Sequence, residues 1–199
     1  MYAKGGRYMG AKMYAKLGTM SAGKSLELLK TAVTYEENGR NVLVIIPKGT
    51  SRKQGFIVSR VGLERNAYEL DATESIVELL RQESRRNYPD VILIDEAQFL
   101  TRDQVEIFAC DVVDGFDIPV IAYGLKTNFK GELFEGSSAL LALADDVAEI
   151  KGICALCDRK ATMNLRLIGG MPSYDGEEVQ IGDKEYKSVC RNHYYNWEE

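Results

Sequence analysis

The sequence predicts an α/β fold, in which a parallel sheet is followed by a small C-terminal domain of different character. Three observations support this prediction. Short runs of purely apolar residues alternate with segments whose apolar residues recur at helical spacing as far as about residue 149. Residues 18–25 read GTMSAGKS, a glycine-bounded loop between an expected strand and an expected helix. From about residue 150, short cysteine-containing pairs replace the alternation.

Length and composition exclude several classes of protein. A chain of 199 residues can bury one substantial core and a small appendage. With 45% hydrophobic and 28% charged residues it is typical of soluble globular proteins, and its net charge of −5 argues against a protein that coats nucleic acid. No apolar stretch approaches the roughly 20 residues of a membrane span, and the N-terminus lacks the apolar middle of a secretory signal. We therefore expect a cytoplasmic protein.

Each expected element has a local signal. The uninterrupted apolar runs at 41–46 and 91–94 are typical of parallel strands buried on both faces. Helical spacing predicts the helices, and Asn38-Gly39 ends the first of them. Gly, Lys, Arg and Ser are frequent in 47–62, so this segment is expected to be mobile and mostly exposed. In chain order, we expect strands over 11–17, 41–46, 91–94 and 119–123, and helices over 24–38, 75–86, 102–109 and 137–146, the last with a serine cap.

The motif at 18–25 has the G-x4-G-K-S pattern of a phosphate-binding loop, or P-loop. Its glycines allow a tight turn that presents N–H groups to phosphate oxygens, its lysine adds a point charge, and its serine can ligate Mg²⁺. The helix that follows adds the positive end of its dipole. A glycine-rich surface turn is the alternative, but the flanking strand and helix favour phosphate binding. The residues expected to contact ATP here are Gly18, Thr19, Met20, Ser21, Ala22, Gly23, Lys24 and Ser25.

Four residues near the C-terminus have the spacing of a structural zinc site. Cys154 and Cys157 form a C-x2-C pair, and Cys190 forms a C-x2-H pair with His193, the single histidine of the chain. Three thiolates and one imidazole complete a tetrahedral Zn²⁺ site, and a closed ligand shell indicates a structural metal. The remaining cysteine, Cys110, is expected to be a small buried side chain.

These motifs divide the chain into three parts. Residues 1–11 are expected to be an N-terminal extension, 12–149 a P-loop nucleotide-binding α/β domain, and 150–199 a zinc-binding domain.

An acidic pair follows the apolar run 91–94, at a strand end where a phosphate loop needs an acidic partner. Asp95 is expected to hold Mg²⁺, directly or through water. A second carboxylate beside it is suited to polarising or deprotonating the attacking nucleophile, so Glu96 is the candidate general base. The alternative is that Glu96 is a solvated acid that caps a helix.

Three phenylalanines, Phe99, Phe129 and Phe134, come just after expected strands, where ligands of open parallel sheets bind. A flat base between such rings would explain them, although each ring taken singly favours a core position. The residues leave open whether the nucleophile is water, as in an ATPase, or a hydroxyl, as in a kinase.

Taken together, the motifs resemble the type II thymidine kinases, the group of human cytosolic, bacterial, poxviral and phage enzymes. The resemblance runs in order from about residue 12 to 195. The motifs that carry it are GTMSAGKS at 18–25, DEAQF at 95–99, GLKTNFKGELF at 124–134, and the two cysteine-containing pairs with Ser188-Val189 before the second. No single motif is unique, but the ordered set is highly specific.

The resemblance implies a RecA-like sheet and Mg²⁺-dependent transfer of phosphate from ATP to the 5′-hydroxyl of thymidine, with Glu96 as the base. It also implies a lasso-like loop, supported by the zinc domain, whose main-chain groups read the nucleoside base. Family members are usually homotetramers and are commonly inhibited by thymidine triphosphate. The implied ATP contacts beyond the loop are Asp95, Glu96, Ala97 and Gln98. The implied thymidine contacts are Met20, Phe99, Leu125, Phe129, Phe134 and Tyr186.

The sequence departs from the family pattern in three places. Residues 181–186 are one residue shorter than the usual segment before the lasso tyrosine, so the register of the lasso contacts stays open. Thr50-Ser51-Arg52 stands where Asp-x-Arg is frequent, so any role of that acid is missing or moved. Asn128 stands where bacterial relatives often have aspartate. The phosphate loop and the acidic pair are unaffected.

Two other functions fit parts of the sequence. DEAQ at 95–98 also resembles helicase motif II, which would indicate a nucleic-acid-dependent ATPase. Such motors need a second RecA-like domain, for which this length leaves no room, and the acidic composition counts against them. A zinc-knuckle binding module with a vestigial nucleotide fold would transfer no phosphate. We therefore expect ATP and thymidine as partners, and neither nucleic acid nor a membrane.

Overall fold

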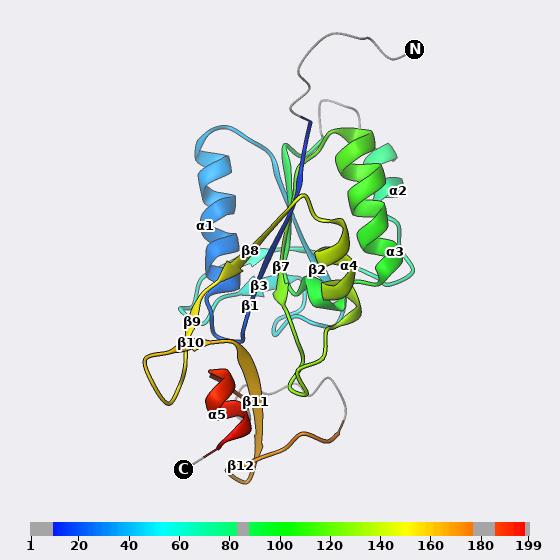
Figure 1. The fold of residues 1–199 in the computed structure, drawn as a ribbon. Helices are drawn as coiled ribbons and strands as arrows, with labels where there is room; N and C mark the ends of the chain where they lie inside the picture. The colour runs from blue at the N-terminus through cyan, green and yellow to red at the C-terminus, as the bar shows by residue number, and fades with distance from the viewer. Residues whose placement is uncertain (1–9, 83–87, 177–185, 198–199) are drawn as a thin grey trace.

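The computed structural model describes residues 10–82, 88–176 and 186–197 (Figure 1). Its centre is a six-stranded sheet in the order β5-β2-β6-β7-β1-β8, and every neighbouring pair is parallel. The predicted α/β class is therefore confirmed. The strands are β1 (Met13–Gly18), β2 (Val42–Pro47), β5 (Tyr68–Leu70), β6 (Val91–Ile94), β7 (Val120–Leu125) and β8 (Asp146–Ile150).

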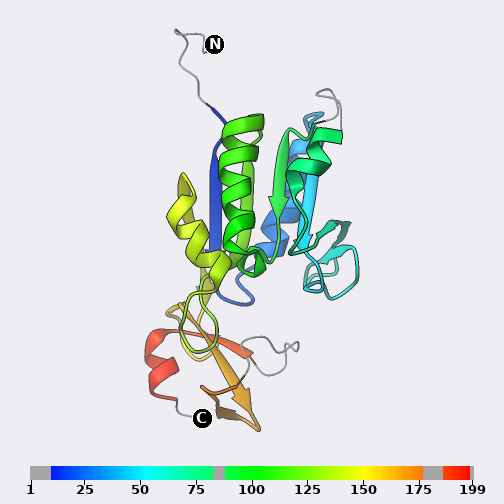
Figure 2. The ribbon, with the colours of Figure 1, turned by 90° about the vertical axis from the view of Figure 1, so that its right-hand side faces the viewer.

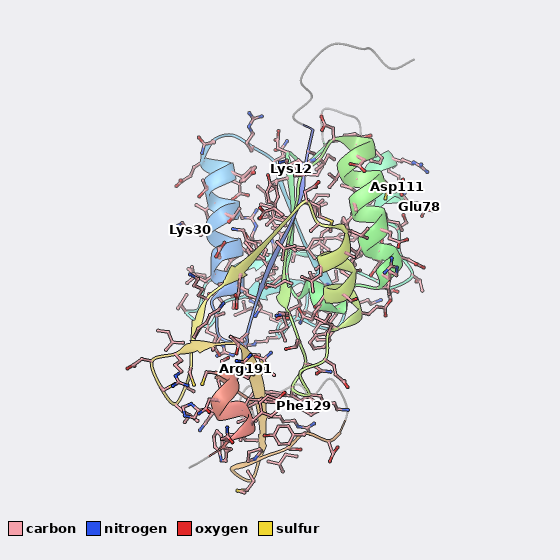
Figure 3. The ribbon with its side chains drawn as sticks, viewed as in Figure 1. Lys12, Lys30, Glu78, Asp111, Phe129 and Arg191 are labelled. Atoms are coloured by element: carbon pink, nitrogen blue, oxygen red, sulfur yellow. The ribbon has the colours of Figure 1, made fainter. Side chains whose placement is uncertain are left out.

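Helices cover both faces of this sheet, with α1 on one face and α2, α3 and α4 on the other (Figures 1 and 2). Each face has its own apolar cluster, because alternate residues of a strand point to opposite sides. All four residues of β6 are 0% exposed, as expected for a central parallel strand. The helices are α1 (Lys24–Glu37), α2 (Ile76–Gln82), α3 (Arg102–Glu106) and α4 (Glu135–Leu143). On their outer surfaces, Lys30 and Glu78 point away from the sheet (Figure 3).

The helix expected over 102–109 is longer than predicted. It starts at a capping box made by Thr101 and Gln104, and continues beyond α3 as the π-helical segment η3 (Ile107–Gly115). Phe108 and Val112 of η3 are fully buried in the core. Cys110 lies two residues from each of them, on the opposite side of the helix, and is exposed. The prediction that Cys110 is buried is therefore wrong.

The helix expected over 137–146 also differs from the prediction. Helix α4 begins at Glu135 with no side-chain cap, because the Ser137 hydroxyl instead donates to the Leu125 carbonyl at 2.6 Å. It ends at Leu143, and the next residues form edge strand β8 rather than a last helical turn. Sheet pairing with β1 therefore overrides helix propensity here.

The segment 47–62 is less exposed than predicted. It contributes β3 (Phe56–Val58), which pairs with β4 (Glu64–Asn66) in an antiparallel hairpin. Ile57 is 1% exposed and packs into the cluster under α1. Within this hairpin, the prediction of a mostly exposed stretch fails only at Ile57 and Ser59, which are buried, while the turn residues 60–62 are exposed as expected.

The chain after β8 forms a small C-terminal module, defined here as residues 152–176 and 186–197, at the carboxyl ends of the parallel strands (Figure 1). It contains a two-stranded and a three-stranded antiparallel sheet and a short helix. Its elements are β9 (Gly152–Ile153), β10 (Lys160–Ala161), β11 (Met163–Ile168), β12 (Met171–Pro172), β13 (Tyr186–Val189) and α5 (Arg191–Tyr195).

Some predictions fall outside the described residues. These are most of the N-terminal extension, the last residues of the helix expected over 75–86, and the shortened segment before Tyr186. The domain boundaries at 11/12 and 149/150 stay predictions. In the described part of the chain, no helix is long and apolar enough to cross a membrane.

Candidate active site

The phosphate-loop motif occupies the turn between β1, which ends at Gly18, and α1, which begins at Lys24. The two glycines of the motif meet different requirements. A Cβ on Gly18 would lie 2.8 Å from the carbonyl oxygen of Ile150, so a side chain cannot fit there. Gly23 has φ +88, in the left-handed region that glycine adopts without strain. The turn leaves the first N–H groups of α1 free of intrahelical partners, which is the arrangement that attracts anions.

Lys24 is held inside this turn. Its ammonium donates to the carbonyl oxygen of Thr19 at 2.9 Å, and the residue is only 8% exposed. Burial lowers the pKa of Lys24, while the negative charges of Glu96 and Asp95 act in the opposite direction. The lysine is therefore a buried cation that faces two carboxylates.

The acidic pair begins where β6 ends. Asp95 is 2% exposed, and burial, together with the charge of Glu96, raises its pKa to about 6. Its Oδ1 atom is buried without a hydrogen-bond partner among the described residues. Glu96 has φ 50 and ψ 35, a left-handed conformation that non-glycine residues seldom adopt and that is frequent at functional sites.

A cavity of about 660 Å³ opens over the phosphate loop and the acidic pair. The β3–β4 hairpin, the loop after β7 and the C-terminal module complete its walls. Thirteen of the predicted site residues line it: Met20, Ser21, Gly23, Lys24, Ser25, Asp95, Glu96, Gln98, Phe99, Leu125, Phe129, Phe134 and Tyr186. The other predicted residues do not line it, namely Gly18, Thr19, Ala22 and Ala97.

Two aromatic pairs line the cavity. The rings of Phe99 and Phe134 meet edge to face, with centroids 5.6 Å apart. Phe129 pairs with Tyr186 at 6.5 Å, and its position on the loop after β7, next to the C-terminal module, is visible in Figure 3. Rings of this kind offer faces and edges to a planar ligand. The lining of the cavity thus combines the charged residues of the phosphate loop and acidic pair with aromatic rings.

The predicted zinc ligands come together in the C-terminal module. The ligand atoms of Cys154, Cys157, Cys190 and His193 all lie within 4.8 Å of one another. Cys154 Sγ is 3.3 Å from His193 Nδ1, and the sulfurs of Cys157 and Cys190 are 3.9 Å apart. Burial opposes ionisation of Cys154, but hydrogen bonds from His193 and backbone groups lower its pKa to about 6. The cluster has the arrangement of a candidate metal site, and its donor set fits Zn²⁺.

A thymidine kinase family model matches residues 11–194. This chain belongs to the thymidine kinase family. The thymidine kinase of Streptococcus thermophilus (strain CNRZ 1066) is 48% identical over 188 residues, or 94% of each chain. That of Lactococcus lactis subsp. lactis (strain IL1403) is 46% identical over 187 residues, 93% of this chain and 97% of the relative. That of Rhodopirellula baltica is 48% identical over 187 residues, 92% of this chain and 88% of the relative.

A solved structure, Bacteroides Pif1 bound to ssDNA, aligns with 71% of this chain and 38% of that one. Its TM-score is 0.39 and its sequence identity 15%, so it has no bearing on fold or function.

In this member of the thymidine kinase family, the module also contacts the phosphate loop directly. Asn164 of β11 is 3% exposed, and its Oδ1 accepts from the Met20 N–H at 2.8 Å. Its Nδ2 donates to the Thr127 carbonyl at 3.0 Å, in the loop that carries Phe129. The hydroxyl of Ser188 donates to the Met20 carbonyl. Both backbone groups of Met20 are therefore held by the module.

Sequence reasoning missed several residues of this thymidine kinase site. Asn164 lies in no motif, and Ser188 was noted only as part of the motif before Cys190, because the contacts of both are with a loop more than a hundred positions earlier. The hairpin residues Arg60 and Val61 line the cavity, although their segment gave no signal beyond its charge. Arg52 also lines the cavity. It lies in Thr50-Ser51-Arg52, the segment that differs from the family's Asp-x-Arg pattern, and that difference was the one sequence signal for this part of the site.

Proposed function

We propose that this protein transfers the γ-phosphate of ATP to the 5′-hydroxyl of thymidine, forming ADP and thymidine 5′-monophosphate. Membership of the thymidine kinase family supports this function. The structural observation that supports it most directly is the single cavity shared by the phosphate loop, Glu96 and the aromatic residues. One cavity lined by both charged and aromatic residues suits a reaction between a triphosphate and a nucleoside.

The phosphate loop is proposed to hold the ATP phosphates. Backbone N–H groups of the turn and the N-terminus of α1 would contact phosphate oxygens, and Lys24 would neutralise their charge. Ser25 and Asp95 are the residues that would hold Mg²⁺, and the unpartnered, buried Oδ1 of Asp95 fits a cation in this place. The ion, when bound with ATP, stabilises negative charge on the phosphate oxygens.

Glu96 is proposed to take the proton from the 5′-hydroxyl as its oxygen attacks the γ-phosphorus. The new P–O bond forms as the bond to the bridging β–γ oxygen breaks, and ADP leaves with the electron pair. Because phosphoryl transfer depends mostly on positioning and charge stabilisation, the contributions required of the protein are orientation and a nearby base. Glu96 lines the cavity beside the phosphate loop, as this role requires.

The thymine base is proposed to bind among Met20, Phe99, Phe134, Phe129 and Tyr186, with Leu125 at its edge. Buried aromatic contacts supply affinity, while backbone groups in an enclosed pocket discriminate between bases, since a wrong base leaves polar groups unpaired.

The remaining family properties enter as part of the proposal. We expect the Cys₃His cluster to hold one structural Zn²⁺ that supports a loop closing over the nucleoside. We expect a cytoplasmic homotetramer that thymidine triphosphate inhibits, with no nucleic-acid or membrane partner.

The test is phosphate transfer from γ-labelled ATP to a panel of nucleosides, with Mg²⁺ present and nucleic acid absent. The expected result is label on thymidine and little on purine nucleosides. Release of free phosphate that depends on added DNA or RNA, with no labelled nucleoside, would instead indicate a nucleic-acid-dependent ATPase. No transfer and no hydrolysis would favour a binding module.

A further inference from the structure

The turn that carries Glu96 contains a buried glutamine with two specific contacts. Gln98 belongs to the short helical turn η2 (Ala97–Phe99) and is 2% exposed. Its Nε2 atom donates to Glu96 Oε2 at 2.6 Å, and its Oε1 atom accepts from the backbone N–H of Leu125 at 2.9 Å. The amide therefore connects the proposed base to the end of β7, where the nucleoside side of the cavity begins.

The orientation of this amide is determined by its partners. A backbone N–H can only donate, so the group that faces Leu125 must be the amide oxygen. The NH₂ group must then face Glu96, where an ionised carboxylate accepts the hydrogen bond. A flipped amide would place two donors together at Leu125 and two acceptors together at Glu96.

Close packing holds the glutamine in place. A Cβ on Gly124 would lie 2.9 Å from Gln98 Oε1 and 3.0 Å from Gln98 N, so β7 approaches the amide closely only because this residue is glycine. From the other side, a Cβ on Gly136 of α4 would lie 2.5 Å from the Ala97 carbonyl and 2.9 Å from that of Gln98. The left-handed conformation of Glu96 is thus enforced by a turn packed on two sides.

We propose that Gln98 is a positioning residue that orients the Glu96 carboxylate toward the nucleoside 5′-hydroxyl. Its amide restrains Oε2 of Glu96 and leaves Oε1 to receive the proton. Because the same amide holds the Leu125 N–H, a nucleoside seated against Leu125 is placed in register with the base. This inference rests on the proposed kinase function and gives Gln98 a role through Glu96, in place of the ATP contact predicted from the DEAQ motif.

The main test replaces Gln98 with methionine, which keeps the length of the side chain and removes both hydrogen bonds. We expect kcat for thymidine phosphorylation to fall about 10- to 100-fold, because a small misplacement of a reacting group has effects of this size. We expect KM for ATP to change less than about threefold, since the phosphate loop is untouched. A fall in ATP affinity equal to the fall in kcat would overturn the proposal.

A double-mutant cycle distinguishes positioning from a general loss of structure. If Gln98 acts through Glu96, then Gln98→Met in a Glu96→Gln background should change kcat by less than about threefold. If the glutamine supports the fold or contacts ATP, the same substitution should reduce kcat equally in both backgrounds. Equal reductions would reject the assignment.

Two further variants keep the test decisive. Gln98→Glu has the same shape but presents an acceptor to Glu96, and we expect kcat to fall at least as far as in Gln98→Met. The matched control is Gln104→Met, which removes another buried glutamine that donates to the Asp71 carbonyl and accepts from the Thr101 N–H, outside the cavity. It should leave kcat within about twofold of the unmodified protein even if the melting temperature falls, as expected for a purely structural amide.

Failure of this inference is separable from failure of the proposed function. If the unmodified protein phosphorylates thymidine and Gln98→Met does so at the same rate, only the role of Gln98 is rejected. If the unmodified protein transfers no phosphate to any nucleoside, the kinase proposal itself is rejected, and with it this inference.

Discussion

The parallel sheet and the C-terminal module maintain their structures by different means. All four residues of Val91–Ile94 are 0% exposed, and two apolar clusters, one on each face, surround them. The module has one small cluster of six buried residues, two of which are the metal-site cysteines Cys154 and Cys190. It also leaves large apolar side chains in solvent, with Ile153 76% and Met171 60% exposed. The sheet is stabilised by burial, whereas the module has little core of its own, and we expect it to depend on a metal ion held by its Cys₃His cluster.

This difference separates two tasks within one site. The groups proposed to perform the chemistry, Lys24, Asp95 and Glu96, lie around the phosphate loop and the end of β6, where burial lowers the pKa of Lys24 and raises that of Asp95. The module contributes restraint through Asn164 and Ser188, which hold the Met20 peptide in place. The core thus carries the groups proposed for the chemistry, and the module restrains the backbone of the proposed phosphate loop.

The largest expected effect is a loss of chemistry without a loss of structure. Glu96→Gln should lower kcat by about 10²- to 10⁴-fold, because the variant cannot accept the proton from the 5′-hydroxyl. ATP binding, measured by titration, should be retained. The control is Glu78→Gln on the exposed side of α2, which should keep full activity. Near-normal turnover of Glu96→Gln would contradict the assignment of the base.

The second-largest effect is expected from removing one ligand of the proposed zinc ion, and the loss of structure should be confined to the module. Cys157→Ser should reduce bound zinc from about one per chain to near zero, because three ligands hold the ion far less tightly than four. Hydrogen exchange should accelerate in β11 and β13 and stay slow in β6. Cys110→Ser, at an exposed position away from the cluster, should keep the zinc. Equal acceleration throughout the sheet would show that the two regions fold as one unit.

A third prediction concerns the contacts between the two regions. Ser188→Ala and Asn164→Leu each remove hydrogen bonds to Met20 and should raise KM for ATP by about 5- to 20-fold, as expected when buried backbone groups lose their partners. Thermal stability of the sheet should change little. Ser173→Ala removes a hydroxyl in the same module that bonds only within it, and should leave KM unchanged. An unchanged KM in all three variants would mean that the loop holds its shape alone.

The smallest expected effect is a gain in stability. Burial and the charge of Glu96 raise the pKa of Asp95 from 3.8 to about 6, so the folded state binds this proton more tightly than the unfolded chain. Ionisation therefore costs stability as the pH rises from about 4 through 6, and the cost is absent below pH 4. Asp95→Asn should stabilise the nucleotide- and metal-free protein at pH 8 by roughly 1–3 kcal/mol, and hardly at all at pH 4.

Thermal unfolding in a chelator at the two pH values provides the measurement. Asp114→Asn, on the exposed side of η3, is the matched control and should show no such pH dependence. A destabilising effect of Asp95→Asn at pH 8 would mean that the partners of the carboxylate outweigh its burial.

Much of the fold could be predicted because the strands of a sheet covered on both faces are uninterrupted runs of apolar residues, which can be recognised in the sequence. The runs 41–46 and 91–94 strongly indicate buried strands. The edge strand Asp146–Ile150 escaped prediction because most of its residues are exposed, and backbone pairing with β1 holds it in place. Similarly, Cys110 was misplaced because its exposure depends on where the helix lies against the core, which composition does not reveal.

The site was predictable where its residues are neighbours in the chain, follow a metal spacing, come directly after a buried strand, or match the family resemblance. GTMSAGKS, the acidic pair and the Cys₃His pattern meet these conditions, and the structure brings the four metal-site residues together. The bridges made by Asn164, Ser188 and the Gln98 amide do not, because each is a single polar side chain whose partner is chosen by the fold. The individual roles of the site residues remain predictions.

The Met20 peptide also links the phosphate loop to the order in which the chain is synthesised. The Met20 N–H is hydrogen-bonded by Asn164, which is translated 144 residues later, and the Met20 carbonyl is hydrogen-bonded by Ser188, which is translated 168 residues later. A nascent chain released before Ser188 contains every strand of the parallel sheet, yet lacks one of the two restraints on its nucleotide loop. Incomplete translation products therefore lack the restrained loop of the full chain. A residue that is translated late thus completes the restraint on a loop that is translated early.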